Sequence, residues 1–202
     1  MSKTIITISR QYCSGGLEVG NRLAGELGID IYDKEQLVDM AAKQIGYDKS
    51  AFERVDEVAT SSLLYSLALG AHMANPNAIM PDNDRLFQIQ SDIIRNAAKE
   101  KSCIFIGRCS DYVLRDNPDA VNIYLRASMT DRINRHNRVY GEVKDTEAFI
   151  NKKDKKKATY YKFYTGRNWS DIKNYDLCIN TSLLSVDDIV GLITDFISKR
   201  TG

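Results

Sequence analysis

The chain has 202 residues, of which 43% are hydrophobic and 27% charged, as is typical of an ordered soluble protein. Its 28 Lys and Arg residues are balanced by 27 Asp and Glu residues, so a net charge of +1 excludes a chain-wide field for coating nucleic acid or an acidic membrane. Four cysteines without a C-x-x-C pair and only two histidines argue against a disulfide framework and a zinc site. Any anion site must be local.

The sequence predicts neither a membrane span nor an exported protein. The longest apolar run, residues 63–74, is interrupted by Ser66, Gly70 and His72 and is shorter than the ~20 apolar residues that a membrane span requires. The first residues lead into a strand-like run without the pattern of a signal peptide. We therefore expect a cytoplasmic protein that binds small molecules, with neither membrane nor nucleic acid as a partner.

Hydrophobic patterns predict strands that alternate with helices. Residues 4–9 form a β-branched run typical of a buried parallel strand, and residues 17–27 repeat apolar positions at helical spacing until Gly28. Further strands are predicted at 29–32, 103–106, 120–125 and 176–180, and further helices at 34–44, 86–98, 130–139, 146–164 and 186–197. Residues 46–83 are predicted to be a helical excursion. This order predicts an α/β protein with a parallel sheet covered on both faces and ligands at the carboxyl ends of its strands.

The loop after the first strand has the composition of an anion site. Residues 9–16 (SRQYCSGG) precede a helix, where backbone N–H groups and the helix N-terminus favour a phosphate. A full P-loop reads G-x-x-x-x-G-K-[ST], with a lysine for the terminal phosphates and a hydroxyl for magnesium. Here Gly15 falls on the second glycine, Gly16 replaces the lysine and Leu17 replaces the Ser or Thr. A plain glycine turn that closes a β-α unit is the alternative.

Other segments extend the pattern over nearly all of the chain outside residues 46–83. They are Ile31–Lys34, Ile106–Arg108, Pro118–Ala120, Ile123–Ser128, Tyr161–Trp169 with the letters YTGRNW, Tyr175–Leu177 and Asn180–Thr181. Together with the loop, their order and spacing resemble the P-loop nucleoside monophosphate kinases, and most closely the cytidylate kinase-like family. The loop of that family runs approximately S-R-Q-x-G-S-G-G and also lacks the lysine.

The resemblance implies a three-layer P-loop kinase fold with a five-stranded parallel sheet in one domain over residues 1–202. It also implies a helical insertion over residues 46–83 that binds the acceptor, and a small lid near residues 140–160. Cys13 takes a glycine position of the family loop, which matters if the backbone there needs a positive φ. A tolerated small side chain is the alternative reading of Cys13, and a thiol near a helix N-terminus can also gain thiolate character.

Phosphoryl transfer requires cations that neutralise the migrating group, and four arginines are the catalytic candidates. They are Arg10, Arg108, Arg132 and Arg135. Arg108 aligns with an arginine that clasps the acceptor phosphate in cytidylate kinases, whereas a surface arginine at a strand end is its alternative. Arg132 and Arg135 share a helix face with Arg138, and pairing with acids such as Asp131 is their alternative. The predicted nucleotide-binding residues are Gln11, Tyr12, Cys13, Ser14, Gly15, Gly16, Leu17 and Glu18.

The acceptor is expected to meet residues from the second strand and from the lysine-rich helix. The candidates are Asp33, Arg108, Lys153, Asp154 and Lys157. Related kinases carry an R-D-x-x-R type pattern where this chain has lysines at 153 and 157, and a solvated helix face is the alternative. Asp33 is also a candidate helix N-cap. The aromatic residues between 160 and 175 could stack a base, but core packing is the more usual role.

These residues predict ATP-dependent phosphoryl transfer to a nucleoside monophosphate, with cytidylate as the first guess, or to a similar small acceptor. Mg²⁺ is an expected cofactor, held by Asp33 or Glu18 through water, because Leu17 cannot bind it. The missing lysine weakens catalysis unless Arg10 or a lid lysine replaces it. A catalytically weak or inactive nucleotide-binding module is therefore the second hypothesis, and an interaction protein with a mere glycine turn is the third.

Overall fold

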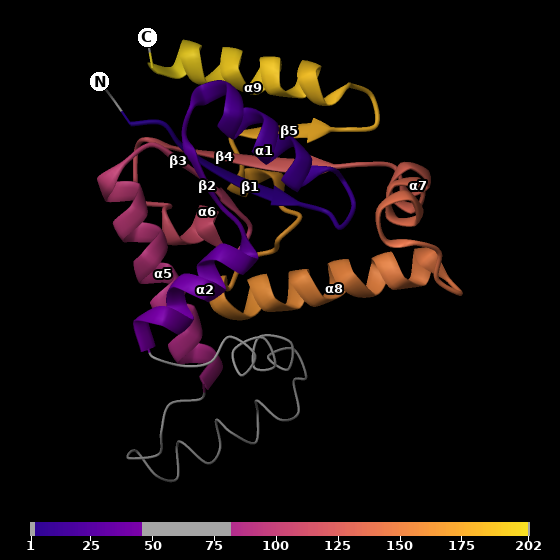
Figure 1. Ribbon diagram of the computed structural model, residues 1–202, viewed down its shortest axis with the longest axis horizontal. Helices are drawn as coiled ribbons and strands as arrows, with labels where there is room; N and C mark the ends of the chain where they lie inside the picture. The colour runs from indigo at the N-terminus through magenta and orange to yellow at the C-terminus, as the bar shows by residue number, and fades with distance from the viewer. Residues whose placement is uncertain (1–2, 46–81, 202) are drawn as a thin grey trace.

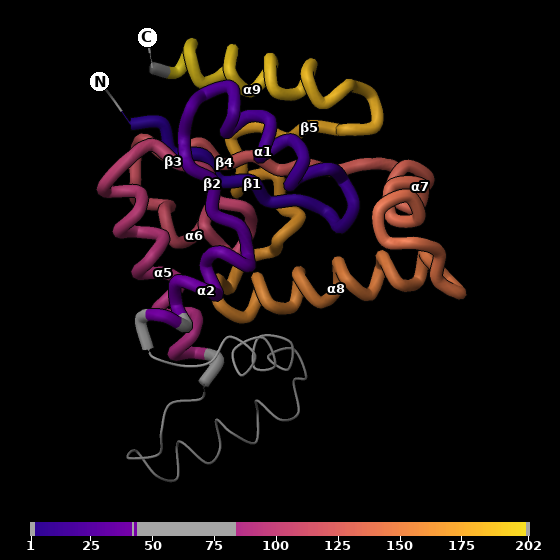
Figure 2. Tube along the Cα trace, viewed as in Figure 1, coloured from indigo at the N-terminus to yellow at the C-terminus, as the bar shows by residue number. Residues whose placement is uncertain are grey.

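The computed structural model describes residues 3–45 and 82–201, and its centre is a five-stranded parallel sheet (Figures 1 and 2). The strands are β1 (Ile5–Arg10), β2 (Asp30–Tyr32), β3 (Cys103–Ile106), β4 (Ala120–Arg126) and β5 (Leu177–Asn180), in the order β2-β3-β1-β4-β5. All four strand pairs are parallel, so the carboxyl ends of the strands lie along one edge. The predicted parallel sheet and α/β class are confirmed.

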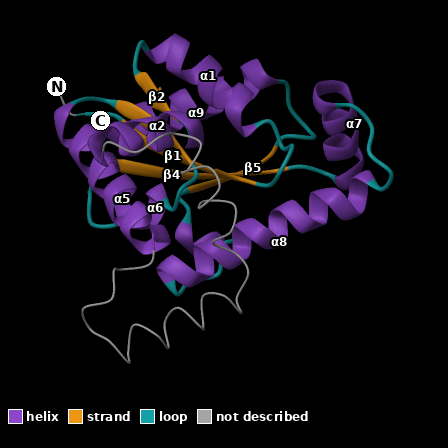
Figure 3. Cartoon of the chain, turned by 60° about the horizontal axis from the view of Figure 1, so that its bottom comes forward, coloured by secondary structure: helices purple, strands orange, loops and turns teal. Residues whose placement is uncertain are grey.

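Helices cover both faces of this sheet. They are α1 (Gly16–Leu27), α2 (Lys34–Ile45), α5 (Asp82–Glu100), α6 (Ser110–Val113), α7 (Met129–Tyr140), α8 (Thr146–Thr165) and α9 (Val186–Thr201). Helices α1 and α9 lie on one face, whereas α2, α5 and α6 lie on the other (Figure 1). Helix α7 lies beyond the carboxyl end of β4, and α8 runs back alongside the sheet (Figure 3). The two helices place polar side chains beside the strand ends.

The central strand β1 explains why its sequence is continuously apolar. Ile6 and Ile8 pack with α1 and α9, while Ile5 packs with α2 and α5 on the opposite face. Side chains alternate along a strand, so a strand buried on both faces requires apolar residues at successive positions. Ile8 pairs with Ile106 of β3 on one side and with Ile123 of β4 on the other. This register brings the ends of β1 and β3 together.

A third, smaller core contains the aromatic residues that follow the lysine run. Cys109, Tyr124, Tyr161 and Trp169 are buried together, with Tyr160 and Tyr175 packed against them. The core role of these aromatics, the alternative to base stacking, is therefore confirmed for Tyr161 and Trp169. Their burial attaches α8 to the sheet and sets the position of its lysines.

Helix ends follow the sequence closely in the described part of the chain. Gly28 ends α1 with φ 63°, and its N–H donates to the carbonyl of Ala24, as a left-handed cap requires. The short α6 and the 3₁₀ turn η1 (Ile172–Asn174) have no repeating pattern and were not predicted. The predicted insertion lies outside the described residues except for Asp82 and Asn83, which begin α5. No helix in the described ranges has the length and apolar content of a membrane span.

Candidate active site

The loop between β1 and α1 is held by its own buried hydroxyl. Ser14 donates from Oγ to the carbonyls of Gln11, at 2.9 Å, and Leu125, at 3.1 Å. The N–H of Gln11 donates to the same Leu125 carbonyl at 3.0 Å, and its side-chain Oε1 accepts from the N–H of Ala127 at 3.1 Å. These bonds fasten the loop to β4. Ser14 is therefore a structural residue of the loop, with its hydroxyl directed inward.

The first turn of α1 offers backbone donors to an anion. Val19 is the first helix residue whose N–H bonds back, to the Gly15 carbonyl at 2.9 Å. Within the described residues, the N–H groups of residues 15–18 have no acceptor, and no side chain caps the helix. Free N–H groups at a helix N-terminus bind phosphate well because the helix dipole adds to their hydrogen bonds. The predicted phosphate-binding loop therefore has the required backbone geometry.

Two residues of the loop adopt the left-handed conformation. Gly15 has φ 84° and Cys13 has φ 59°. Cys13, at a glycine position of the family loop, thus occupies a backbone position with a positive φ. A non-glycine residue pays about 1 kcal/mol for this conformation. Burial raises the pKa of the Cys13 thiol, which argues against thiolate character.

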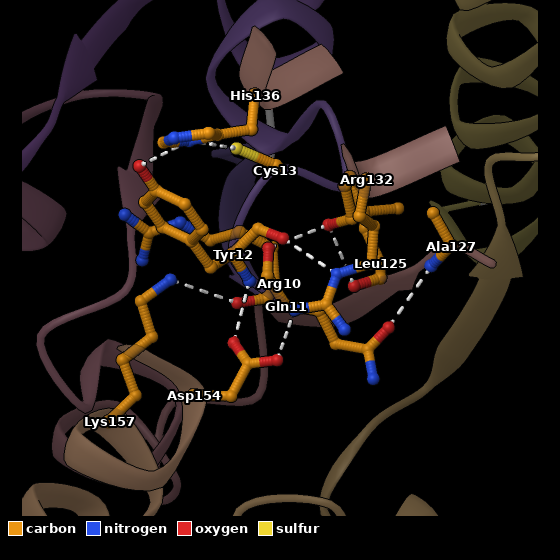
Figure 4. A network of polar contacts seen from close by, with 11 residues as sticks. Arg10, Gln11, Tyr12, Cys13, Leu125, Ala127, Arg132, His136, Asp154 and Lys157 are labelled. Atoms are coloured by element: carbon orange, nitrogen blue, oxygen red, sulfur yellow. Dashed lines mark hydrogen bonds and ion pairs between the residues drawn. The ribbon is translucent and has the colours of Figure 1, made fainter. Parts of the chain in front are cut away.

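A buried ion pair fastens α8 and α7 to the loop (Figure 4). Asp154 of α8 accepts from the Tyr12 N–H at 2.7 Å and pairs with Arg132 of α7. Arg132 also donates from Nε to the Tyr12 carbonyl at 2.7 Å, and its side chain is only 4% exposed. The structure thus brings both predicted site residues to the loop, where each already has partners. Their contacts position the loop against the two helices.

Arg135 lies over the free backbone donors. Its Nη1 pairs with Glu18 Oε2 at 2.6 Å, and its guanidinium lies so close to Gly15 that a side chain there would collide with it. Both partners of this ion pair are partly exposed. Unlike Arg132, Arg135 therefore has a place at the phosphate site from which it can turn to an anion.

A cavity of about 220 Å³ opens at the ends of β1 and β3. Its charged lining residues in the described ranges are all cations: Arg10, Lys34, Arg108, Lys153, Lys156 and Lys157. Tyr160, Tyr161 and Trp169 form its aromatic side. Six cations around so small a cavity repel one another, so a multiply charged anion is the ligand that such a cavity favours.

Arg108 is held in a strained turn at the end of β3. Gly107, Arg108 and Cys109 have φ values of 72°, 59° and 57°, three successive left-handed residues. The guanidinium donates to Gln90 Oε1, at 2.9 Å from Nε, and lies 5.0 Å from the centre of the Tyr160 ring. Left-handed non-glycine residues cost energy and concentrate at functional sites. The turn therefore aims Arg108 into the cavity at an energetic cost.

Burial and like charges change the acidity of two cations. Burial, followed by the charges of Arg10 and Arg132, lowers the pKa of Lys157 to about 7, although Asp154 opposes the change. Its ammonium donates to the Arg10 carbonyl at 3.3 Å. Burial and the Arg108 charge lower the pKa of Arg10 to about 10, so Arg10 stays charged at neutral pH. An incoming anion would relieve both side chains.

Asp33 serves as a helix cap. Its Oδ1 accepts from the Gln36 N–H at 3.0 Å, and Gln36 Oε1 accepts from the Asp33 N–H at 3.0 Å. This reciprocal pair is a capping box at the start of α2, which confirms the helix-cap alternative. Asp33 is not among the residues that line the cavity, whereas its neighbour Lys34 is.

The described residues form no cage for a metal ion. No three His, Cys, Asp or Glu side chains gather there, Glu18 is paired with Arg135, and Leu17 presents a half-exposed apolar side chain at the Ser or Thr position. Mg²⁺ in kinases takes many of its ligands from phosphates and water. In the described part, the protein's own donors therefore do not fit a dedicated Mg²⁺ site.

The comparisons with known proteins agree with this geometry. A family model described as the cytidylate kinase-like family matches residues 5–183. The chain belongs to the cytidylate kinase-like family. A search of the curated proteins finds no match.

Solved structures share the fold of this cytidylate kinase-like chain. An uncharacterized protein from Eubacterium ventriosum has 25% identity and a TM-score of 0.74, with 97% of this chain and 99% of that chain covered. A shikimate kinase from Bacteroides thetaiotaomicron has 12% identity and a TM-score of 0.55, covering 96% and 98%. A gluconokinase from Sinorhizobium meliloti has 11% identity and a TM-score of 0.54, covering 98% and 93%. The P-loop kinase fold is thereby established.

Three lining or supporting residues of this kinase-like site were missed from the sequence. Lys34 directly follows Asp33, and Lys156 belongs to the predicted lysine run, so their positions carried a signal. Gln90 carried none, because a glutamine inside an amphipathic helix resembles any other polar residue. The lysine run itself divides, since 153, 156 and 157 line the cavity while Lys152 and Lys155 are exposed outside its lining.

Proposed function

We propose that this chain transfers the γ-phosphoryl group of ATP to an acceptor that itself carries a phosphate. A nucleoside monophosphate is the preferred class and cytidylate the first acceptor to test. Within residues 3–45 and 82–201, every charged residue that lines the cavity is a cation, and the N–H groups of residues 15–18 have no acceptor. Arg10 links the two features, because it lines the cavity and packs against Gly16, and this combination carries the proposal. The loop amides suit the donor phosphates, and the cavity suits the acceptor phosphate.

The charge of the cavity favours a phosphate over a hydroxyl as the attacking group. A hydroxyl must lose a proton to a base during transfer, as the catalytic aspartate of protein kinases illustrates. A phosphate acceptor attacks through an oxygen that is already ionised. No carboxylate lines the cavity among the described residues, and Asp33 is engaged in its helix cap. This arrangement suits an anionic acceptor.

A coupled ADP-release assay tests the proposal. MgATP is combined in turn with cytidylate, other nucleoside monophosphates, shikimate and gluconate, using the wild type and Arg108→Ala. We expect turnover with a nucleoside monophosphate that is lost in Arg108→Ala. Arg95→Ala, which removes an exposed α5 guanidinium paired only with its neighbour Asp92 in the described part, is the matched control and retains wild-type turnover. Turnover of a hydroxyl acceptor alone would contradict the phosphate assignment.

A nucleotide-binding module without turnover is the second candidate. Gly16 and Leu17, at the positions of the P-loop lysine and hydroxyl, favour it. Calorimetry distinguishes the two, because the module binds ATP or cytidylate saturably without releasing ADP. If the protein bound neither ATP nor cytidylate, both candidate functions would be excluded.

A further inference from the structure

Compared with the P-loop pattern, this chain has a cation where the pattern has its first glycine, and a glycine where the pattern has its lysine. In G-x-x-x-x-G-K-[ST], the first glycine stands five residues before the second glycine. With Gly15 on the second glycine, the first falls on Arg10 and the lysine falls on Gly16. The cation is therefore at the end of β1, and the small residue is at the start of α1.

The Arg10 side chain fills the space in which a residue-16 side chain would begin. A Cβ on Gly16 would lie 2.5 Å from Arg10 Cγ and 2.9 Å from Arg10 Cβ. Real Cβ atoms essentially never approach that closely, so an arginine at 10 and any larger residue at 16 exclude each other. The arginine at position 10 and the absence of a side chain at position 16 are therefore structurally linked.

A second glycine admits the guanidinium to the cavity. A Cβ on Gly107, which has φ 72°, would collide with Nη1 of Arg10. The guanidinium therefore lies against the backbone at the end of β3, beside Arg108, and lines the cavity. Within the described ranges it donates no hydrogen bond and forms no ion pair. Its surroundings in the described residues include the repelling charge of Arg108 and the attracting charge of Asp33. A partly buried cation without a hydrogen bond is costly, and that cost falls when an anion arrives.

We propose that Arg10 performs the function of the P-loop lysine, with its guanidinium reaching the migrating phosphoryl group from the end of β1 across Gly16. This inference rests on the proposed function and deepens it. In the transfer, an acceptor phosphate oxygen forms a bond to the γ-phosphorus while the bond to the β–γ bridging oxygen breaks. ADP leaves with that electron pair, and charge is conserved between reactants and products. Arg10 keeps its protons and stabilises the charge on the phosphoryl oxygens.

Lys157 is the competing replacement for the lysine, and the geometry disfavours it. Its ammonium comes from α8 and donates to the Arg10 carbonyl at 3.3 Å. Arg10, by contrast, passes directly over the residue whose role it takes. The three atoms nearest to a Cβ at residue 16 all belong to Arg10, so Arg10 is the cation that contacts the P-loop lysine position.

Exchanging the two residues back tests the inference. Arg10→Gly, Gly16→Lys and the double variant Arg10→Gly/Gly16→Lys are compared for ADP release and for ATP affinity by calorimetry. We expect Arg10→Gly to lower kcat by roughly 10²–10³-fold, as loss of one preorganised charge does. Gly16→Lys is expected to be impaired as well, because the new side chain meets the Arg10 stem. The double variant removes the clash, and its kcat is expected to exceed that of either single variant by at least about tenfold.

The controls separate each outcome. Arg95→Ala is expected to match the wild type in kcat and in ATP affinity. Thermal unfolding of every variant identifies any variant that fails to fold. Arg10→Lys keeps the positive charge but lacks the planar guanidinium, which can donate two parallel hydrogen bonds. Its kcat is expected to lie between those of the wild type and Arg10→Gly. Wild-type-like turnover in Arg10→Gly, or a double variant no better than its parents, would overturn the inference alone.

Failure of the proposed function gives a different pattern. If the wild type binds ATP but turns over no acceptor, the function fails, while the inference still requires weaker ATP binding in Arg10→Gly and recovery in the double variant. Equal ATP affinity in the wild type and Arg10→Gly would then refute the inference too. A wild type that binds no ATP overturns both.

Discussion

The cavity has two unlike walls, and their difference separates two kinds of cation. On the strand wall, Arg10 and Arg108 stand at the ends of neighbouring strands, one laid across glycine backbone and the other bonded to Gln90. On the helix wall, Lys153, Lys156 and Lys157 extend from α8. Planar guanidinium groups on rigid strands suit the directional contacts of a transition state. Ammonium groups on flexible stems suit ligand capture, so we expect the strand wall to govern kcat and the helix wall affinity.

The largest effect is expected on the strand wall. Arg108→Ala should lower kcat by roughly 10²–10³-fold, because it removes one oriented charge from the acceptor phosphate. Arg108→Lys should recover only part of this loss, because an ammonium cannot reproduce the fork that meets Gln90. Steady-state kinetics with the best acceptor provide the measurement. If both variants changed KM alone, Arg108 would contribute to binding and not to kcat, and the proposed difference between the two walls would be wrong.

The next largest effect concerns the attachment of the helix wall. Asp154→Ala should lower the free energy of unfolding by about 3 kcal/mol, because it removes the charge partner of the buried Arg132 and the acceptor of the Tyr12 N–H, and leaves Arg132 only the Tyr12 carbonyl. Urea denaturation measures the loss. A double variant, Arg132→Met with Asp154→Leu, should recover much of it, since no buried charge remains unpaired. A loss below about 1 kcal/mol for Asp154→Ala would mean that α8 is held by other contacts.

A smaller effect tests the helix wall through pH. Lys157 has a pKa of about 7 in the free protein and gains charge when an anion binds, so binding above pH 7 must take up a proton. Affinity for a phosphate ligand should therefore fall by up to about tenfold per pH unit from pH 7.5 to 9, where the ligand's own pKa near 6 no longer matters.

Calorimetry in two buffers of different ionisation enthalpy counts that proton directly. Lys157→Met should bind the phosphate ligand more weakly than the wild type at pH 7 and should take up no proton at this position. Lys157→Arg should stay charged and should bind the ligand as well at pH 9 as at pH 7.5. Proton uptake that is the same in the wild type and Lys157→Met would exclude Lys157 as its source.

The sequence reveals the fold more fully than the site because periodicity reports burial directly. The run at 103–106 and the stripe from Leu86 to Ala98 each appear where they were predicted, as β3 and α5. Pairing across the site has no such signature. The amino-acid sequence does not show that Asp154 accepts from the Tyr12 N–H, because 142 residues separate the two. Nor does it show that the Arg10 side chain packs on Gly16, because that contact depends on the rotamer of Arg10. Residue types were therefore predictable, whereas partners were not.

The smallest effect concerns the loop that joins the two walls. Cys13→Gly should raise the free energy of unfolding by up to about 1 kcal/mol, because glycine adopts φ 59° without the steric cost of a Cβ, although it adds some entropy to the unfolded chain. The raised pKa of the Cys13 thiol means that the substitution removes no charge from the phosphate site.

Cys178→Gly is the matched control for Cys13→Gly, because the same change in the extended backbone of β5 should destabilise the protein. Both variants are compared with the wild type by urea denaturation. A Cys13→Gly protein less stable than the wild type would show that the cysteine side chain, which contacts His136 at 4.0 Å, contributes more than its backbone conformation costs. In the described residues, the same loop carries the N–H groups of 15–18 that have no acceptor, so a stabilised Cys13→Gly protein with unchanged turnover would show that these donors do not depend on the Cys13 side chain.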